Sequence, residues 1–282
     1  MTEFKSFLNT VEGNEGKKCN YPTRLDTYGC GCSHDCKYCY AKSLLKFRKL
    51  WTPDNPSVAD IEKIRAAVAS LPDDKIIRLG GMTDCFQPIE KVHRVTYETI
   101  KALNARKIGY LIVTKSAIVA DSEYLEVMDK ELAHIQVSIT ATDDNVARAY
   151  EKASPTSARI KAIETLQEHG FDVSVRLSPF VPQFVDFGII NSIKCDKILV
   201  EFLRVNGWIK KWFRIDYSEY TVKQDGYRHL PLERKIGYIS RIKGKQVSVC
   251  EDETRAYWFW KRHFNPNQED CCNLTLKGGE AQ

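Results

Sequence analysis

The sequence lacks the features that mark membrane, repeat and disordered proteins. Its 282 residues contain no repeat and no low-complexity segment, and no run approaches the ~20 apolar residues of a membrane-spanning helix. The start, MTEFKSFLNT, lacks the apolar core of a secretory signal. An excess of one charge is also missing, because the net charge is only +5 at pH 7, which permits an anionic partner without requiring one. We therefore expect a cytoplasmic protein without membrane contact.

The composition is that of a globular chain, with 43% hydrophobic and 28% charged residues. Short β-branched runs alternate with segments of helical periodicity. A helix is expected from Ser57 to Leu71, and another ends at Gly170, where glycine suits a left-handed cap. Regular alternation predicts strand–helix units around a parallel sheet, either an open barrel or a flat, doubly wound sheet. The predicted strands are residues 23–28, 75–79, 108–114, 134–140, 172–178 and 197–203.

The C-terminal part of the chain has a different composition. Residues 204–262 hold more Lys and Arg than Asp and Glu, and they are rich in aromatic side chains. Basic side chains interleaved with rings can contact phosphates and stack on bases. The alternative is that Trp208, Trp212, Trp260 and their neighbours pack this extension onto the rest of the protein. The sequence leaves both interpretations open.

The ten cysteines are unevenly distributed. Cys32, Cys36 and Cys39 form C-x3-C-x2-C in the segment after the first strand. Clustered cysteines in a reducing compartment indicate a metal before they indicate disulfides. Three thiolates from one loop can hold three corners of an iron–sulfur cube and leave the fourth iron open to a ligand that is not protein. A zinc site with His34 of the same loop as its fourth ligand is the alternative.

The segment YGCGCSHDCKYCYA resembles the cysteine loop of the radical S-adenosylmethionine (SAM) superfamily. The resemblance lies in the three-cysteine spacing, in Tyr38 before the last cysteine and in the strand–helix units that follow, and it covers about residues 20–205. It implies an α/β fold with a partial (βα)6 barrel of the TIM type, a 4Fe-4S cluster held by the three cysteines, and SAM on the open iron. It also implies an external reductant of the flavodoxin or ferredoxin type and an enzyme that abstracts hydrogen with a 5′-deoxyadenosyl radical.

Later strand ends suit the parts of SAM that the resemblance implies. Two adjacent glycines allow backbone carbonyls to approach a ligand closely, and a following threonine or aspartate can accept from an ammonium group. Hydroxyls and cations at the carboxyl ends of parallel strands suit a ribose and a carboxylate. Each residue taken alone is equally a solvated strand end or turn. The candidate SAM-binding residues are Tyr38, Gly80, Gly81, Thr83, Asp84, Thr114, Lys115, Ser116, Ser138, Thr140 and Arg176.

Within the superfamily, CSHDCKYCYA, MTD and the later TK resemble the spore photoproduct lyase and DNA-photolyase-like group. In that lyase a hydrogen-donating cysteine precedes the pair that corresponds to Thr83 and Asp84. Here Gly81 takes that place, and Cys85 lies on the other side of the pair. The resemblance therefore implies a different radical reaction on a nucleobase, such as rearrangement of a modified thymine. The candidate catalytic residues are Tyr38, Tyr40 and Cys85.

These observations lead to one expected function and two alternatives. The expected function is a radical SAM enzyme, a lyase or isomerase, that modifies a base in nucleic acid and uses the basic, aromatic extension as its substrate surface. One alternative is a radical SAM enzyme that acts on a peptide or a small metabolite. The other is a non-catalytic, metal-stabilised nucleic-acid-binding module. The expected division of the chain is an N-terminal segment 1–22, a core 23–205 and an extension 206–282 packed on that core.

Four further cysteines, Cys19, Cys250, Cys271 and Cys272, lie near the two ends of the chain. Folding can bring separate thiolates together, so two or three of them can complete a second iron–sulfur cluster, with Cys30 as a competing ligand. The alternative is that Cys250 is a small buried side chain and that the adjacent pair is incidental, because no C-x2-C spacing marks a site here.

Overall fold

The computed structural model describes residues 4, 6–251 and 254–276. Its centre is one eight-stranded sheet with the order β1-β2-β5-β6-β7-β8-β9-β12. Neighbouring strands from β2 to β12 are parallel, whereas β1 is antiparallel to β2. The strands are β1 (Leu8–Thr10), β2 (Thr23–Leu25), β5 (Ile76–Leu79), β6 (Gly109–Thr114), β7 (Ala133–Ile139), β8 (Asp172–Phe180), β9 (Lys197–Phe202) and β12 (Gln246–Val249).

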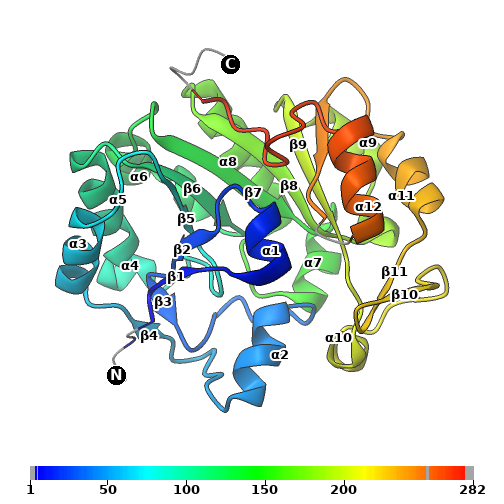
Figure 1. Ribbon diagram of the computed structural model, residues 1–282, viewed down its shortest axis with the longest axis horizontal. Coiled ribbons are helices and arrows are strands. Elements are labelled where there is room, and N and C mark those ends of the chain that lie inside the picture. Colours follow the sequence, from blue (N-terminus) through cyan, green and yellow to red (C-terminus); the bar gives the residue numbers. More distant parts are fainter. Residues whose placement is uncertain (1–3, 5, 252–253, 277–282) are drawn as a thin grey trace.

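Helices cover the outer side of this curved sheet (Figure 1). The inner side carries α1 (Gly13–Lys18) and α12 (Thr254–Phe259). The predicted α/β fold with a parallel sheet is confirmed, and the sheet is open, because β1 and β12 form its two edges. The outer helices are α3 (Ile61–Ala69), α5 (Val95–Ala105), α6 (Ser122–Val127), α8 (Thr156–Glu168), α9 (Phe187–Ser192) and α11 (Leu232–Ile239).

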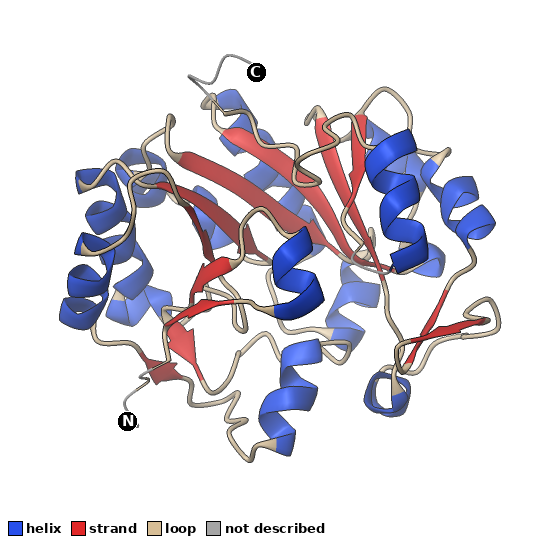
Figure 2. Ribbon diagram, viewed as in Figure 1, coloured by secondary structure: helices blue, strands red, loops and turns tan. Residues whose placement is uncertain are grey.

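Smaller elements complete the fold, and several of them lie along the lower edge of Figure 2. The Cα register pairs β3 with β4 and β10 with β11, both antiparallel. These elements are β3 (Tyr28–Gly29), α2 (Tyr40–Phe47), β4 (Ser57–Val58), α4 (Glu90–His93), the 3-10 turns Ala117–Ala120 and Pro182–Phe184, α7 (Asp144–Tyr150), α10 (Gly207–Trp212), β10 (Val222–Gln224), β11 (Tyr227–His229) and the π-helical turn Trp260–Phe264.

The structure corrects one predicted helix start and confirms one helix end. Ser57 belongs to β4, where it pairs with Gly29, so α3 begins only at Ile61. Asp60 caps α3, since its carboxylate accepts from the backbone N–H of Glu62 at 2.9 Å. Gly170, just beyond α8, adopts φ +79° and provides the expected left-handed cap.

The first predicted strand, residues 23–28, is shorter in the structure. Strand β2 ends at Leu25, because the next residue, Asp26, turns its carboxylate to the loop after β5 and accepts backbone hydrogen bonds from Gly81, Met82 and Thr83. The chain then forms β3 in a separate two-stranded sheet. This break sets the position from which the cysteine loop starts.

The extension after residue 205 is part of the same sheet, because β12 pairs in parallel with β9. Trp260 is buried and stacks on Phe202 of β9, with ring centroids 6.3 Å apart. Trp208 in contrast is 49% exposed. The packing interpretation therefore applies to Trp260, whereas Trp208 is left accessible to solvent. Within the described part of the chain, no helix combines the length and apolar character needed to cross a membrane.

Candidate active site

The cysteine loop lies between β3 and α2, at the carboxyl ends of the first strands. Two tight turns shape it, since the Asp35 N–H donates to the Cys32 carbonyl at 3.0 Å and the Cys39 N–H donates to the Cys36 carbonyl at 3.2 Å. Asp35 has φ +39° in the first of these turns. Cys39 then stands at the N-cap position of α2. The short spacing of the three cysteines thus directs their thiols into one cavity, which all three line.

The three thiols suit a shared cation. Burial raises the pKa of each of them, and Asp84 adds to this effect at Cys32, as Glu151 does at Cys36. The thiols also raise one another's pKa where they approach. A cation bound by all three as thiolates removes both penalties, and three soft donors on one side leave the cavity side open, so the residues fit an iron–sulfur cube.

His34 of the same loop does not join the cysteines as a fourth ligand in this arrangement. Its Nε2 lies 3.3 Å from Oδ2 of Asp84, and both side chains are buried. The contact ties the loop to the end of β5, so the structure gives His34 a positioning role.

The glycine turn after β5 lines the same cavity. Its backbone N–H groups point to Asp26, with donor–acceptor distances of 2.8 Å from Gly81 and 3.1 Å from Thr83. Gly80 adopts φ +85°, which glycine tolerates without strain. The Tyr40 hydroxyl donates to the Gly81 carbonyl at 2.6 Å. Asp26 was not a sequence candidate, because nothing local links it to a turn 55 positions further along the chain.

Asp84 connects three elements and is already saturated with donors. Its carboxylate accepts from the Thr114 hydroxyl at 2.8 Å and from the backbone N–H groups of Lys115 at 2.7 Å and Phe86 at 2.8 Å. Burial opposes its ionisation, but His34 and these hydrogen bonds lower its pKa to about 2. Thr83 is engaged as well, since its hydroxyl donates to the Tyr28 carbonyl. Thr83 and Asp84, the two acceptors expected for the ammonium group of SAM, therefore both already have protein partners.

The remaining candidate SAM ligands do not all reach the cavity. Ser138 and Arg176 line it, and they are register partners on β7 and β8. Arg176 donates to Gln136 at 2.6 Å and also pairs with Glu201. The other two hydroxyl candidates lie elsewhere: Ser116 caps the following 3-10 turn, and Thr140 lines a separate small pocket beside Tyr38.

The three candidate catalytic side chains have different surroundings. Tyr38 lines the cavity, its ring lies under Lys115 Nζ at 5.7 Å, and its buried hydroxyl has no hydrogen-bond partner among the described residues. Tyr40 also lines the cavity but uses its hydroxyl on Gly81. Cys85 is fully buried in the hydrophobic core and lies apart from the cavity. The structure thus brings the two tyrosines to the site and leaves Cys85 outside it.

The cavity itself has a volume of about 390 Å³ and extends from the cysteine loop along the inner face of the sheet. Arg24 and Arg78 line it as register partners on β2 and β5. Each has a buried Nε without a hydrogen-bond partner among the residues described. Arg24 is ion-paired with Glu15 and Arg176 with Glu201, so the charge of this face that suits an anionic ligand comes mainly from Arg78. Arg78 was not a sequence candidate, although an arginine within the otherwise apolar strand IleIleArgLeu could have indicated a functional residue.

Comparison with known proteins agrees with this geometry. Residues 27–190 match the model of the radical SAM superfamily. The chain belongs to the radical SAM superfamily. The superfamily is characterised by an iron–sulfur cluster, SAM and a reductant, which agrees with the expectation from the sequence. Membership favours an enzyme over the alternative of a non-catalytic binding module.

Solved radical SAM enzymes share the fold. Spore photoproduct lyase in complex with dinucleoside spore photoproduct aligns with a TM-score of 0.62 and 15% identity, over 87% of this chain and 81% of that one. SuiB of Streptococcus suis bound to precursor peptide SuiA aligns with a TM-score of 0.55 and 14% identity, over 82% of this chain and 49% of that one. At these identities the likeness concerns the fold.

Two uncharacterised proteins are similar in sequence. One, from Methanocaldococcus jannaschii, is 29% identical over 166 residues, which are 55% of this chain and 60% of that protein. The other, from Mycobacterium tuberculosis strain H37Rv, is 24% identical over 201 residues, which are 65% of this chain and 59% of that protein. This radical SAM chain thus spans about three fifths of the length of these relatives.

Proposed function

We propose that this enzyme modifies a nucleobase within a nucleic acid, with Cys32, Cys36 and Cys39 as the cluster ligands. When bound, the cluster and SAM supply a 5′-deoxyadenosyl radical that abstracts hydrogen from the substrate. The three thiols lie together in the cavity and have no disulfide partners, so their arrangement supports this ligand set. In this proposal SAM would bind in the part of the cavity next to these three thiols.

The other cavity residues position ligands in this proposal. Asp26 and Tyr40 hold the glycine turn from its N–H side and its carbonyl side respectively. Arg78 is the main source of positive charge for a carboxylate or phosphate along the sheet. Asp84 fixes the cysteine loop, through His34, to the end of β6. Tyr38 packs with its ring edge on Phe213, at 5.4 Å between centroids, and closes the cavity beside the loop.

The observation that carries the substrate class is an exposed basic and aromatic surface beside the cavity. It is formed by α2 and α10, which pack side by side. Tyr40 of α2 and Ile209 of α10 also line the cavity, so the surface is continuous with the cavity mouth. Phe47 is 80% exposed on α2. We call this the α2/α10 surface. Its exposed side chains are Tyr40, Leu44, Lys46, Phe47, Trp208, Lys210, Lys211 and Arg214, and the half-buried Lys42 and Trp212 lie between them.

Rings and cations are interleaved on the α2/α10 surface. The Nζ atoms of Lys42 and Lys46 lie 5.6 Å and 5.5 Å from the Trp212 ring centroid. The rings of Trp208 and Trp212 are 5.5 Å apart. Soluble proteins rarely leave such rings in water without a use for them. A surface that offers both stacking faces and phosphate contacts suits a single strand or a base displaced from a duplex.

Repair of a thymine dimer fits the site less well than another base modification. The position of the lyase's hydrogen-donating cysteine is taken here by Gly81, and the nearby thiol of Cys85 is buried in the core. A cysteine at that position is therefore missing here, and a reaction that returns or rearranges the substrate radical by another route suits these residues better.

Salt-dependent binding tests the substrate class. Labelled DNA and RNA oligonucleotides, single- and double-stranded, are titrated with the anaerobically reconstituted enzyme at several salt concentrations. We expect the Lys210→Glu, Lys211→Glu, Arg214→Glu variant to bind more weakly and to lower the slope of log affinity against log salt by about one for each phosphate that it no longer neutralises. Cleavage of SAM without substrate should be unchanged.

The matched control carries the same charge change at the amino-terminal ends of the strands. It alters Lys75, Lys107 and Lys130, which are exposed residues preceding β5, β6 and β7. This control should bind nucleic acid as the wild type does. A Cys36→Ala variant should bind the oligonucleotides but lose SAM cleavage. No binding of any oligonucleotide at low salt, or equal loss in both charge variants, would refute the proposal and favour a peptide or small metabolite as substrate.

A further inference from the structure

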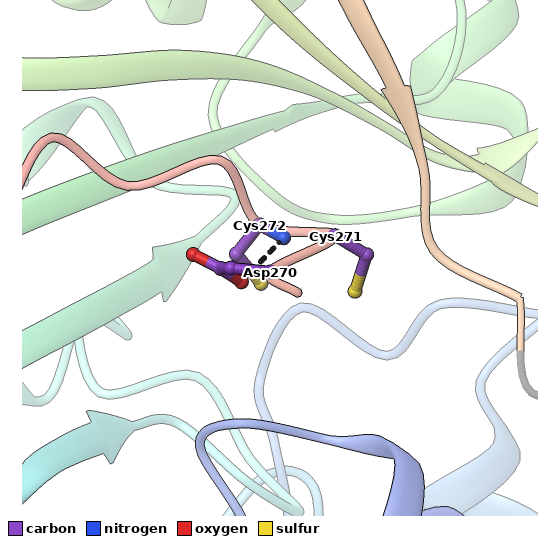
Figure 3. A group of neighbouring side chains, drawn as sticks. All are labelled: Asp270, Cys271 and Cys272. Carbon is purple, nitrogen blue, oxygen red and sulfur yellow. Dashed lines mark hydrogen bonds between the residues drawn. The ribbon is translucent and has the colours of Figure 1, made fainter. Parts of the chain in front are cut away.

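Four cysteines outside the loop converge at the other end of the cavity. Cys19 follows α1, Cys250 follows β12, and Cys271 and Cys272 lie in the C-terminal segment, yet all four line the cavity. They pack in one cluster with Leu111 and Leu199, and each is a free thiol. Figure 3 shows the thiols of Cys271 and Cys272 directed to the same side of the C-terminal segment.

The four thiols lie close enough to act as one set. Ligand atoms of Asp270, Cys271 and Cys272 all lie within 4.8 Å of one another. The Cys271 thiol interacts with those of Cys250 and Cys272. The Cys19 thiol in turn interacts electrostatically with Cys250 and Cys272. Cys30, the competing ligand that the sequence allowed, does not line this cavity.

Asp270 positions the segment and is not the missing ligand. Its Oδ2 accepts from the Tyr21 hydroxyl at 2.7 Å and from the Leu274 N–H at 3.1 Å. Its Oδ1 accepts from the Cys272 N–H at 2.8 Å, which is the dashed line in Figure 3. Both carboxylate oxygens are thus used to hold the segment, and the thiols remain as donors.

The surroundings hold the C-terminal segment in place. Lys197 Nζ at the start of β9 donates to the Asn273 carbonyl at 2.8 Å, and the Thr275 N–H donates to Asp172 at 2.9 Å. Cys19 lies between α1 and β2, and Cys250 follows the edge strand β12. Helices α1 and α12 approach each other where Lys18 Nζ lies 4.7 Å from the Tyr257 ring centroid. The cysteines therefore stand where the sheet is not closed by strand pairing.

Positive charge at this place suits a set of thiolates. Arg78 acts electrostatically on both Cys19 and Cys272, and Arg176 acts on Cys272. The buried Nε of Arg78 has no hydrogen-bond partner among the described residues, so the sheet offers an unpaired donor to this end of the cavity. Anionic iron–sulfur centres are stabilised by such donors and charges.

The origin of the four thiols favours an iron–sulfur cluster over a single zinc ion. Zinc sites are typically marked by closely paired C-x2-C ligands, and that spacing is absent around Cys19, Cys250, Cys271 and Cys272. Thiolates from separate segments can each hold a different iron of one polynuclear cluster.

We infer that Cys19, Cys250, Cys271 and Cys272 hold a second iron–sulfur cluster, which closes the open side of the sheet and lines the cavity opposite the cysteine loop. The inference uses these residues alone and does not depend on the substrate. It assigns the N-terminal segment and the C-terminal segment a common role, because neither provides enough thiols by itself.

Counting metal in the full chain tests the inference. The wild type, reconstituted anaerobically with iron and sulfide, should hold about eight irons per chain. A variant with Cys32, Cys36 and Cys39 all changed to Ala leaves the second set intact, and it should keep about four irons, acid-labile sulfide and a reducible cluster signal in electron paramagnetic resonance. Complete loss of iron in this folded variant would overturn the inference, as would one zinc ion per chain in place of iron.

The reciprocal variants locate the site. Cys271→Ala with Cys272→Ala, and separately Cys250→Ser, should lower the iron count from about eight to about four and leave SAM cleavage by the loop cluster measurable. Cys195→Ala is the matched control, since Cys195 is buried away from the cavity, and it should keep about eight irons. Circular dichroism verifies that each variant is folded. An unchanged iron count in both reciprocal variants would refute the assignment.

Discussion

Asp84 shows how one carboxylate organises the loop region at the residue scale. Its oxygens accept from Thr114, Lys115 and Phe86, and His34 of the cysteine loop stands against it. The sequence suggested Asp84 as a ligand for SAM, but these contacts show a carboxylate whose charge holds three segments together. Its pKa of about 2 expresses that stabilisation.

The lowered pKa of Asp84 predicts a pH dependence. A carboxyl group whose pKa is lower in the folded than in the unfolded chain stabilises the fold above pH ~4 and loses this effect as pH falls towards 2. From the shift of 3.8 to about 2, the contribution is about 2 kcal/mol. We expect the free energy of unfolding in urea of the iron-free chain to fall less between pH 5 and 2 in Asp84→Asn than in the wild type. If the free energy of unfolding falls equally with pH in the two proteins, the stabilising role of the Asp84 carboxylate is contradicted.

At the scale of elements, the turn after β5 depends on Asp26, the residue that directly follows β2. Asp26 accepts the N–H groups of Gly81, Met82 and Thr83 within 3.1 Å, and an unsatisfied buried N–H costs about 1–3 kcal/mol. The side chain of Arg24 also limits the turn, because a Cβ on Gly81 would lie 3.0 Å from its Cβ. The glycine turn is therefore shaped from the neighbouring strand.

Loss of Asp26 should loosen the turn and weaken SAM binding. We expect Asp26→Ala to lower the affinity for SAM at least about tenfold, because several buried N–H groups lose their acceptor. Asp26→Asn keeps one oxygen and should lose less. Equilibrium dialysis of SAM against the reconstituted enzyme measures the effect, and the iron content of the loop cluster serves as control. An Asp26→Ala enzyme with wild-type affinity and full iron would show that the turn is held by other contacts.

At the scale of the whole molecule, the extension and the core form one structure. Strand β12 covers the edge of β9, and Trp260 and Phe213 are buried in the same apolar core as the strands. A chain that ends at residue 205 would expose that edge and remove both rings, and a free, apolar strand edge favours aggregation. We expect this truncated chain to be insoluble or to unfold without cooperativity in urea. A cooperative transition would establish residues 23–205 as an independent domain.

The sequence by itself determined those features that depend on residues close together in the chain. The three loop cysteines lie within one turn-rich segment, so their spacing was enough to indicate a cluster, and the alternation of strands and helices was enough to indicate a parallel sheet. The left-handed cap at Gly170 is equally local. The boundary of α3 was missed because Ser57 pairs with Gly29, a contact that periodicity does not report.

Tertiary structure alone decided the features that join distant residues. Asp26 reaches the glycine turn, Arg24 meets Arg78 by strand register, and Asp84 accepts the N–H of Lys115 at the end of the next strand. Cys19 and Cys250 meet the C-terminal pair only because the fold brings the segment after α1, the end of β12 and the C-terminal segment into one cluster. Contacts of this kind depend on strand order and curvature, which no local spacing encodes, so only the folded chain could show that the scattered cysteines form one set.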